Sequence, residues 1–304
     1  MSGHIAILMA VRNGAGYLQE QLASIASQRH ADWSLHVSDD RSEDGSMEIV
    51  KAFAAGRPGQ VTLRTGPGRG GAQNFLALLD DATVPQDTAT AWCDQDDVWL
   101  PDRLARAVAA CATDAPVLYA SRYRVLRGDG SEGAPSTRLQ RPVTFGNALV
   151  QNPLPGHTMV ANAPAARMLR KAVTAALAAD VPFHDWWTCQ ILVGAGANVV
   201  FDETPGVLYR QHGGNQVGAR GGPKASMERW RIIGDGRFAT WLDRNAAALS
   251  ATDLLTQENA TLLERFIAWR QTGGRRASLA SLGIWRQDRL GGLALTAGAR
   301  LRLF

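Results

Sequence analysis

Apolar and polar positions alternate in blocks along the first part of the chain. Residues 4–11 form a continuous apolar run, which is typical of a strand buried on both faces of a sheet. Leu18, Leu22 and Ile25 then recur at helical spacing as far as Gln28. The same reasoning predicts strands at 33–37, 61–65 and 89–93 and helices at 45–55, 72–80 and 101–111.

This order of elements predicts an α/β fold. Alternating strands and helices favour a mostly parallel twisted sheet flanked by helices. Ligands of such sheets bind beyond the carboxyl ends of the strands. Arg12-Asn13, Asp39-Asp40 and Asp94–Asp97 each follow a predicted strand. We therefore expect these polar segments to meet at one edge of the sheet.

The pattern changes after about residue 115. Residues 117–126, followed by Gly128-Asp129-Gly130, indicate a hairpin or an edge excursion. Further predictions are helices at 164–179 and 186–194, a short strand at 199–201, a flexible glycine-rich loop at 213–222 and mostly helical structure at 227–269. The expected organisation is an α/β domain over residues 1–216 and a mainly helical C-terminal extension over residues 217–304.

Composition indicates a globular protein with a substantial core. The 304 residues are 45% hydrophobic and 20% charged. No run approaches the ~20 apolar residues of a membrane span, and the first residues lack the pattern of a signal peptide. Cys93, Cys111 and Cys189 form no Cys-x-x-Cys pair. We therefore expect a reduced, cytoplasmic compartment with neither a zinc site nor a disulfide framework.

The net charge of +4 is unevenly distributed. Between Arg265 and Phe304 the sequence has eight arginines and one acidic residue, Asp288. Such a segment favours contact with an anionic surface, either membrane headgroups, phosphorylated lipid or nucleic acid. A solvated helical face is the alternative interpretation of the same charges.

Asp94, Asp96 and Asp97 place three carboxylates within four residues at the end of a predicted buried strand. Close carboxylates repel one another, and burial disfavours their ionised forms. A divalent cation removes that cost, and Mg²⁺ or Mn²⁺ commonly shares oxygen ligands with substrate phosphates. The acids therefore predict a metal site, although a solvated acidic turn has the same sequence.

Residues 66–71 fit the pattern G-x-G-x-x-G between a strand and a helix, which hints at dinucleotide binding. The match follows the third predicted strand, however, whereas that fingerprint belongs to the first. Asp94 lies at the distance of a ribose-binding acid, but a ribose contact does not need its acidic neighbours. We therefore favour a turn that brings backbone close to a nucleotide, with Arg69 facing a phosphate or solvent, over an oxidoreductase.

Two later segments carry candidate side chains. Asp185 is either a helix cap or a carboxylate on the wall of a site, where partial burial would raise its basicity. Arg210 and His212 adjoin the glycine-rich loop. His is a common metal ligand and Arg a good phosphate partner, although a lone His is more often structural.

Taken in order, these segments resemble the family 2 glycosyltransferases of the GT-A fold, most closely the rhamnosyltransferase-like bacterial members. The matching segments cover residues 4–216, and the last ~85 residues match no motif. They are Asn13-Gly14-x-x-Tyr17-Leu18-x-x-Gln21-Leu22-x-Ser24-Ile25-x-x-Gln28, Ser38-Asp39-Asp40-x-Ser42-x-Asp44-Gly45-Ser46, Gly70-x-x-x-Asn74-Phe75, Asp94-Gln95-Asp96-Asp97-x-Trp99, His184-Asp185-Trp186-Trp187 and Tyr209-Arg210-x-His212-x-x-Asn215.

The resemblance implies a role for several acids. Asp40, with Asp39, would hydrogen-bond a pyrimidine base, and Asp94 would contact ribose or sugar hydroxyls. Asp96, supported by Asp97, would ligate Mg²⁺ or Mn²⁺.

His212 would contact the metal or the diphosphate, and Asp185 would be the general base. Arg12 departs from the family pattern, which often has an aromatic residue there, although a guanidinium can also stack on a base. The full set expected at the nucleotide-sugar is Ala10, Arg12, Asn13, Asp39, Asp40, Arg69, Gly70, Asn74, Asp94, Gln95, Trp187 and Arg210.

The resemblance also implies a reaction. The donor would be a dTDP- or UDP-sugar, with dTDP-rhamnose favoured, and the acceptor a hydroxyl of a bacterial surface glycan or of a lipid-linked glycan. One base without an evident nucleophile predicts inversion at the anomeric carbon. The basic tail would hold the enzyme near the inner face of the cytoplasmic membrane, and no nucleic-acid partner is expected.

Two other functions fit some of the same residues. A sugar nucleotidyltransferase would also use a metal and acids, but Arg12-Asn13-Gly14 is a poor substitute for its glycine-rich, basic first turn. An inactive nucleotide- or glycan-binding module is the non-enzymatic alternative. Nothing in the sequence requires it, because Asp94, Asp96 and Asp185 are all present.

Overall fold

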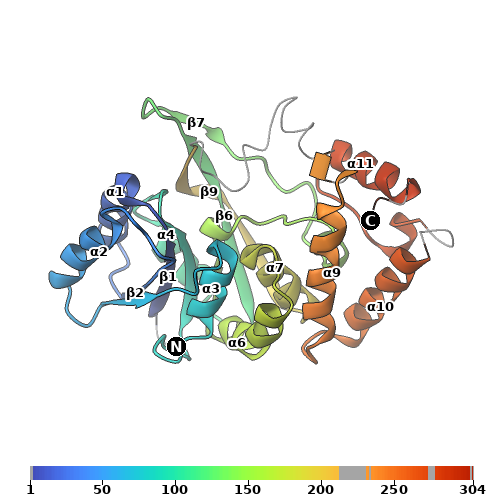
Figure 1. Cartoon of the computed structure of the whole chain (residues 1–304), viewed down its shortest axis with the longest axis horizontal. Helices are drawn as coiled ribbons and strands as arrows, with labels where there is room; N and C mark the ends of the chain where they lie inside the picture. The colour runs from blue at the N-terminus through green and yellow to red at the C-terminus, as the bar shows by residue number, and fades with distance from the viewer. Residues whose placement is uncertain (1–2, 212–230, 233, 273–277, 302, 304) are drawn as a thin grey trace.

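The computed structural model describes residues 3–211, 231–232, 234–272, 278–301 and 303 (Figure 1). A single sheet runs through it in the order β3-β2-β1-β4-β8-β6-β9-β5, with β7 paired to β6. The strands are β1 (Ile5–Val11), β2 (Trp33–Asp39), β3 (Val61–Thr65), β4 (Ala89–Asp94), β5 (Val98–Trp99), β6 (Val117–Leu126), β7 (Glu132–Pro135), β8 (Val160–Ala161) and β9 (Asn198–Arg210).

Helices cover both faces of this sheet. The helices of the described residues are α1 (Ala15–Ala26), α2 (Ser46–Ala55), α3 (Gly71–Leu79), α4 (Arg103–Ala110), α5 (Phe145–Ala148), α6 (Ala163–Ala178), α7 (His184–Gly194), α9 (Arg237–Ser250), α10 (Gln257–Gln271) and α11 (Arg289–Arg300), with short 3-10 turns η1 (Gly156–Thr158) and η2 (Ala280–Leu282).

The sheet is mostly parallel, as expected. β1 pairs in parallel with β2 and β4, β2 with β3, and β6 with β9. The short strands β5, β7 and β8 are antiparallel to their neighbours. The register places Val11 opposite Asp39 and Ala10 opposite Asp94. The carboxyl ends of β1, β2 and β4 therefore finish side by side, which is where we expected a site.

The apolar run of β1 is buried on both faces of the sheet. Ile5, Ile7 and Met9 pack into one hydrophobic cluster with α1, α2 and α4. Ala6 and Leu8 point the other way, into a second cluster with α3, α6 and α7. All five side chains are fully buried. The lack of hydrophobic alternation in this strand is the consequence of these two covered faces.

The C-terminal helices extend the second cluster. Phe238 of α9 and Phe266 of α10 belong to it together with Trp186 of α7, and the rings of Trp186 and Phe238 stack with centroids 6.3 Å apart. In Figure 1, α9 lies beside α6 and α7, with α10 and α11 beyond it. The boundary expected at residue 216 falls outside the described residues, so the division into two domains stays a prediction.

Within the described part of the chain, no helix is both long and apolar enough to cross a membrane.

Several elements differ from the sequence expectation, among them β9 and β5. β9 has 13 residues rather than three, because it continues through a polar stretch where its pairing with β6 shifts register between Ser121 and Tyr123. Irregular pairing of this kind interrupts the two-residue alternation that identifies a strand. β5, only two residues long, was not expected at all. Pairing of Val98 with Leu208 across the sheet creates it.

A row of polar side chains on α1 and just after its end holds the loop after β4. Gln21 Nε2 donates to Asp94 O at 3.0 Å, and Ser24 Oγ accepts from Trp99 N at 3.0 Å. Gln28 Nε2 donates to Leu100 O at 2.9 Å, and its Oε1 accepts from Leu104 N at 3.1 Å. These buried contacts explain why polar residues recur among the apolar ones of α1.

Gln28→Ala should destabilise the protein by about 1–3 kcal/mol. The substitution leaves the buried amide of Leu104 without its bond, and an unsatisfied buried group costs about 1–3 kcal/mol. The carbonyl of Leu100 keeps a bond from Arg103 N at 3.0 Å. Denaturant unfolding measures the loss. Gln19→Ala is the matched control, because Gln19 is exposed on α1 and should change stability by less than about 0.5 kcal/mol. Equal losses in the two variants would contradict the proposed role of Gln28.

Candidate functional site

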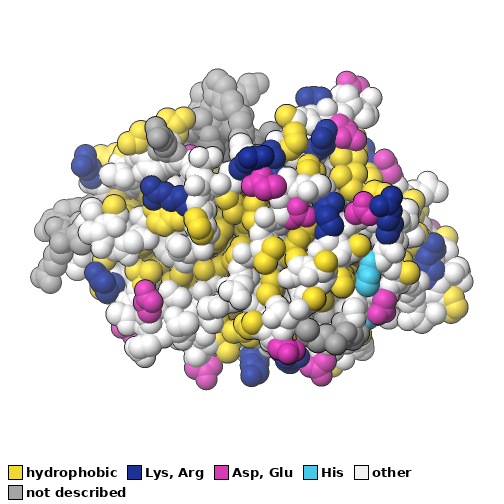
Figure 2. Space-filling model, turned by 180° about the vertical axis from the view of Figure 1, so that it is seen from behind, with side chains coloured by type: hydrophobic (Ala, Val, Ile, Leu, Met, Phe, Trp, Pro, Cys, Tyr) yellow, Lys and Arg dark blue, Asp and Glu magenta, His cyan; other side chains and the backbone are white. Residues whose placement is uncertain are grey.

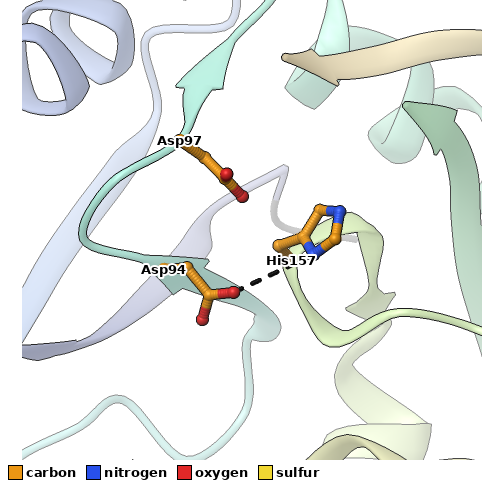
Figure 3. Close-up of side chains that lie close together, drawn as sticks. All are labelled: Asp94, Asp97 and His157. Atoms are coloured by element: carbon orange, nitrogen blue, oxygen red, sulfur yellow. Dashed lines mark ion pairs between the residues drawn. The ribbon is translucent and has the colours of Figure 1, made fainter. Parts of the chain in front are cut away.

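Asp94, Asp97 and His157 converge at the carboxyl end of β4. Each offers one ligand atom, and these atoms lie within 4.8 Å of one another (Figure 3). The Nδ1 atom of His157, on the turn η1, lies 3.8 Å from the Oδ2 atom of Asp94. Two carboxylates and an imidazole at these separations are a donor set that a divalent cation can use.

The electrostatics of the two acids support this fit. Burial, with repulsion from Asp96 and Asp185, raises the pKa of Asp94 to about 8, although 38% of its side chain is accessible to solvent. Burial and the charges of Asp94 and Asp96 also raise the pKa of Asp97, which is fully buried. Asp97 Oδ1 accepts from Arg210 N at 3.1 Å, whereas Oδ2 has no hydrogen-bond partner in the described part of the chain. A cation beside Oδ2 would remove both penalties.

A buried arginine, Arg103, binds the backbone of His157. Arg103 is 0% exposed, and its guanidinium lies 3.6 Å over the ring of Trp99. Arg103 Nη2 donates to His157 O at 2.8 Å. Burial lowers the pKa of Arg103 to about 10, so the group stays charged at neutral pH. Its positive charge in turn opposes the rise in the pKa values of the neighbouring acids.

Aromatic rings fix the orientation of the His157 imidazole. The ring stacks on Tyr209 with centroids 4.9 Å apart and meets Tyr123 edge-on at 5.2 Å. The sequence analysis missed both His157 and Arg103. The available signal was weak, a histidine directly after Pro155-Gly156 and an arginine at the start of a helix, and neither pattern is specific.

Asp185 lies at the start of α7 and faces the same site. Its Oδ2 atom accepts from Gly156 N at 3.0 Å, and Oδ1 accepts from Trp186 N at 2.8 Å. Its charge contributes to the raised pKa of Asp94, which places it near the acidic loop. The N-cap of α7 is Phe183, with no side-chain cap bond, so the helix-cap interpretation of Asp185 is wrong. Asp185 is instead an acid in the first turn of α7 whose carboxylate lies on the wall of the site.

The loop after β1 is tied to its neighbours. Gln95 Oε1 accepts from Arg12 N at 2.8 Å, and Gln95 Nε2 donates to Arg12 O at 3.0 Å. Asn13 has a positive φ of 49°, and its Oδ1 accepts from Glu43 N at 2.8 Å. The side chains of Asn13 and Gln95 thus brace the rim of the site, whereas the exposed Arg12 guanidinium lies 4.0 Å from Asp40.

Asp40 organises the glycine-rich loop from inside. The carboxylate is 1% exposed and accepts from Gly68 N at 2.6 Å and Gly70 N at 2.7 Å. A Cβ atom at Gly66 would lie 2.5 Å from Oδ1 of the buried Asn74, and Gly70 has a φ of 89°. These glycines are needed for contacts within the protein. Asp40 occupies the amides that a phosphate-binding loop would offer, which argues against the dinucleotide fingerprint.

The other expected donor contacts fall into two groups. Ala10 and Asp39 are partly exposed at the strand ends, whereas Asn74 and Trp187 are 0% exposed. Asn74 Nδ2 donates to Ser38 O at 2.8 Å. Both residues lie in the interior, and Trp187 belongs to the core behind α7, so contact of either with a donor stays a prediction.

Arg69, Arg210 and Asp96 lie near the site. Arg69 Nη2 pairs with Asp180 at 3.0 Å, across the loop before α7. Arg210 Nε donates to Asp96 O at 2.9 Å, and its guanidinium also pairs with Glu20. The Asp96 side chain is not one of the three converging groups. His212, the other expected metal ligand, lies outside the described residues, as does the loop expected at 213–222.

Comparison with known proteins agrees with this geometry. The model of glycosyl transferase family 2 matches residues 6–177. The dTDP-rhamnosyl transferase RfbG of Shigella flexneri is 26% identical over 246 residues, which are 80% of this chain and 84% of that protein. The UDP-Glc:alpha-D-GlcNAc-diphosphoundecaprenol beta-1,3-glucosyltransferase WfgD of Escherichia coli is 22% identical over 129 residues, 42% of this chain and 49% of that protein.

Solved structures match the fold. TarS 1–349 of S. aureus, in complex with UDP-GlcNAc, aligns with a TM-score of 0.55 and 14% identity over 87% of this chain and 71% of that chain. The mannosyltransferase PcManGT from Pyrobaculum calidifontis, in complex with GDP-Man and Mn²⁺, aligns with a TM-score of 0.50 and 18% identity. The alignment covers 98% of this chain and 86% of that chain.

Without metal, the protein should lose stability as the pH rises from about 4 toward 8. An unfolded Asp titrates near pH 4, but folded Asp94 and Asp97 keep their protons to higher pH. Between these values the folded state binds more protons, so the contribution of the two acids to the free energy of unfolding falls with pH. Melting curves in a chelator from pH 5 to 8 measure this. Asp97→Asn should flatten the dependence, whereas Asp114→Asn, at an exposed acid, should not.

A slope unchanged in Asp97→Asn would show that the buried acid is ionised throughout this range and would contradict the assigned direction of its pKa.

Proposed function

The chain belongs to glycosyl transferase family 2 and has the GT-A fold, and from this premise we propose that it moves a sugar from a nucleoside-diphosphate donor to a hydroxyl of an acceptor. The observation that carries the proposal is the meeting of Asp94, Asp97 and His157 with Asp185 beyond the carboxyl ends of parallel strands. Acids for a metal and a candidate base then share one site.

We propose dTDP-rhamnose as the donor. Support comes from RfbG, which is named a dTDP-rhamnosyl transferase and matches over most of both chains. The partly exposed Ala10 and Asp39 and the exposed Arg12 are the groups at the strand ends to which a base and ribose could bind. UDP-sugars are the second candidate, because TarS was solved with UDP-GlcNAc on a similar fold.

A divalent cation, Mg²⁺ or Mn²⁺, fits the site. The unpartnered Oδ2 of buried Asp97 supports this, as does the presence of Mn²⁺ in the PcManGT complex. Asp94, Asp97 and His157 would hold the ion, with Asp96 and His212 as the alternative ligands implied by family resemblance. When bound, such an ion neutralises the charge that develops on a departing diphosphate.

Asp185 would act as the general base. The acceptor oxygen forms a bond to the anomeric carbon while the bond from that carbon to the diphosphate oxygen breaks, and the hydroxyl proton passes to Asp185. The bonds from Gly156 N and Trp186 N fix this carboxylate in place but leave lone pairs for the acceptor hydroxyl. A single displacement of this kind inverts the anomeric configuration, and inversion is part of the proposal.

We propose a lipid-linked bacterial surface glycan as the acceptor. The name of WfgD specifies a diphosphoundecaprenol-linked acceptor, which supports this class. Such a lipid is reached from the cytoplasm at the inner face of the membrane, where we place the enzyme. Neither a nucleotidyltransferase nor an inactive binding module is favoured by an observation in the structure.

Asp185→Asn should reduce sugar transfer by about 10²–10⁴-fold, the usual effect of losing a general base. The asparagine retains the size of the side chain and can still accept a hydrogen bond from Gly156 N. Donor binding, measured by titration calorimetry with Mn²⁺, should therefore persist. Transfer from dTDP-rhamnose, UDP-glucose and UDP-GlcNAc to a polyprenyl-diphosphate glycan, followed by mass spectrometry, measures activity and donor choice together.

Asp87→Asn is the control, because this acid is exposed and pairs with the surface residue Arg167 at 3.2 Å, away from the acidic loop. Near-normal transfer by Asp185→Asn would refute the base assignment. Formation of a sugar nucleotide from a nucleoside triphosphate would instead identify a nucleotidyltransferase, and failure to turn over any donor would indicate a binding module.

Metal-ligand variants should weaken Mn²⁺ binding in different ways. His157→Ala and Asp97→Asn should each reduce Mn²⁺ affinity by about ten-fold or more if the converging groups are ligands. Asp96→Ala should reduce Mn²⁺ affinity to the same extent if Asp96 is the metal ligand, as the family resemblance implies. Electron paramagnetic resonance of free Mn²⁺ measures affinity without donor. Full affinity in all three variants would contradict a metal at this acidic loop.

A further inference from the structure

The last helix, α11, and its C-cap residue Leu301 expose three leucines that no described part of the chain covers. The exposed fractions of Leu290, Leu293 and Leu301 are 73%, 67% and 67%, and these are the exposed large hydrophobic residues of the described chain. At 3.6 residues per turn they lie within about 80° of arc on one side of the helix. Leu295, on the inner side, is 3% exposed and joins the core. We call the three residues the leucine face.

The leucine face belongs to the basic segment of the chain. Eight arginines and one acidic residue lie between Arg265 and Phe304, while the rest of the chain has 24 basic and 27 acidic residues. Arg265 on α10 and Arg300 at the end of α11 are exposed. Figure 2 shows apolar and basic side chains next to one another at the end of the molecule that holds these helices, on the left of that view.

We propose that the leucine face is a docking surface for an anionic phospholipid bilayer. A helix that presents leucines outward beside arginines can bury the leucines at the boundary of headgroups and acyl chains while the arginines meet lipid phosphates. Anionic lipids attract clustered basic residues within about a Debye length of the surface. Both components are present on α11 and its neighbours, and neither is required by the chemistry at Asp94 and Asp185.

A second copy of the chain is a poorer occupant. Two copies that meet through the leucine face about a two-fold axis would bring both arginine-rich segments together, and like charges at such an interface repel. A lipid surface supplies the opposite charge instead. The biological role of this surface rests on the proposed function, because the enzyme would reach a lipid-linked acceptor at the same membrane. The binding itself does not depend on that function.

Vesicle flotation of the full-length protein tests the inference. Vesicles of phosphatidylcholine with about one third phosphatidylglycerol should carry the wild-type chain, and vesicles of phosphatidylcholine alone should carry much less. The triple variant Leu290→Gln/Leu293→Gln/Leu301→Gln should reduce binding to the anionic vesicles by about ten-fold or more. High salt should weaken wild-type binding, because it screens the arginine contribution.

Thr261→Gln, at an exposed position of α10, is the control and should bind as the wild type does. Melting curves establish that the triple variant is folded. Binding of the triple variant at the wild-type level, or failure of the wild type to bind anionic vesicles, would overturn the inference. The inference would also be overturned if the triple variant changed its oligomeric mass but still bound vesicles. The leucines would then join two copies of the chain. No sugar nucleotide is used, so these results are independent of transferase activity.

Discussion

The site depends on holding mutually repelling carboxylates close together at the end of a buried strand. Asp97 is fully enclosed and lies within 4.8 Å, atom to atom, of Asp94 and His157. The protein offsets part of the repulsion with the amide of Arg210 and the buried charge of Arg103. Burial and the repulsion that is not offset raise the pKa values of Asp94 and Asp97. The folded chain thus retains an electrostatic penalty that a divalent cation can relieve and a neutral ligand cannot.

Much of the surrounding polar sequence is committed to supporting this loop. Gln21, on α1, binds the carbonyl of Asp94, and Gln95 binds both backbone groups of Arg12. Asp40 holds the glycine-rich loop through two amides. Such residues look like ligand contacts in the sequence, yet their polar atoms are already used within the protein. Buried polar groups need partners, so a rim built from several strand ends requires many polar side chains whose function is to brace it.

Helices and strands with a clear hydrophobic pattern could be predicted from the sequence. Contacts between segments far apart in the sequence could not. The strands β1–β4 and their helices followed from apolar runs, so the parallel sheet and the position of Asp94 at the carboxyl end of β4 were predictable. His157 was not, because only the fold brings η1 beside β4. The inward direction of Trp187 was missed for a related reason: α7 is buried almost all round, so no polar face in its sequence distinguishes core from site.

The turn η1 joins the two halves of the proposed chemistry. Gly156 donates its amide to Asp185, the next residue is His157, and the carbonyl of His157 accepts from Arg103. One short turn therefore orients the candidate base on α7 and a candidate metal ligand beside β4. Any Cβ at Gly156 would lie 2.8 Å from that of Asp185, so the approach requires glycine. The place of the candidate base relative to the acidic loop is consequently fixed by close backbone packing at Gly156, and the proposed single displacement needs preorganisation of this kind.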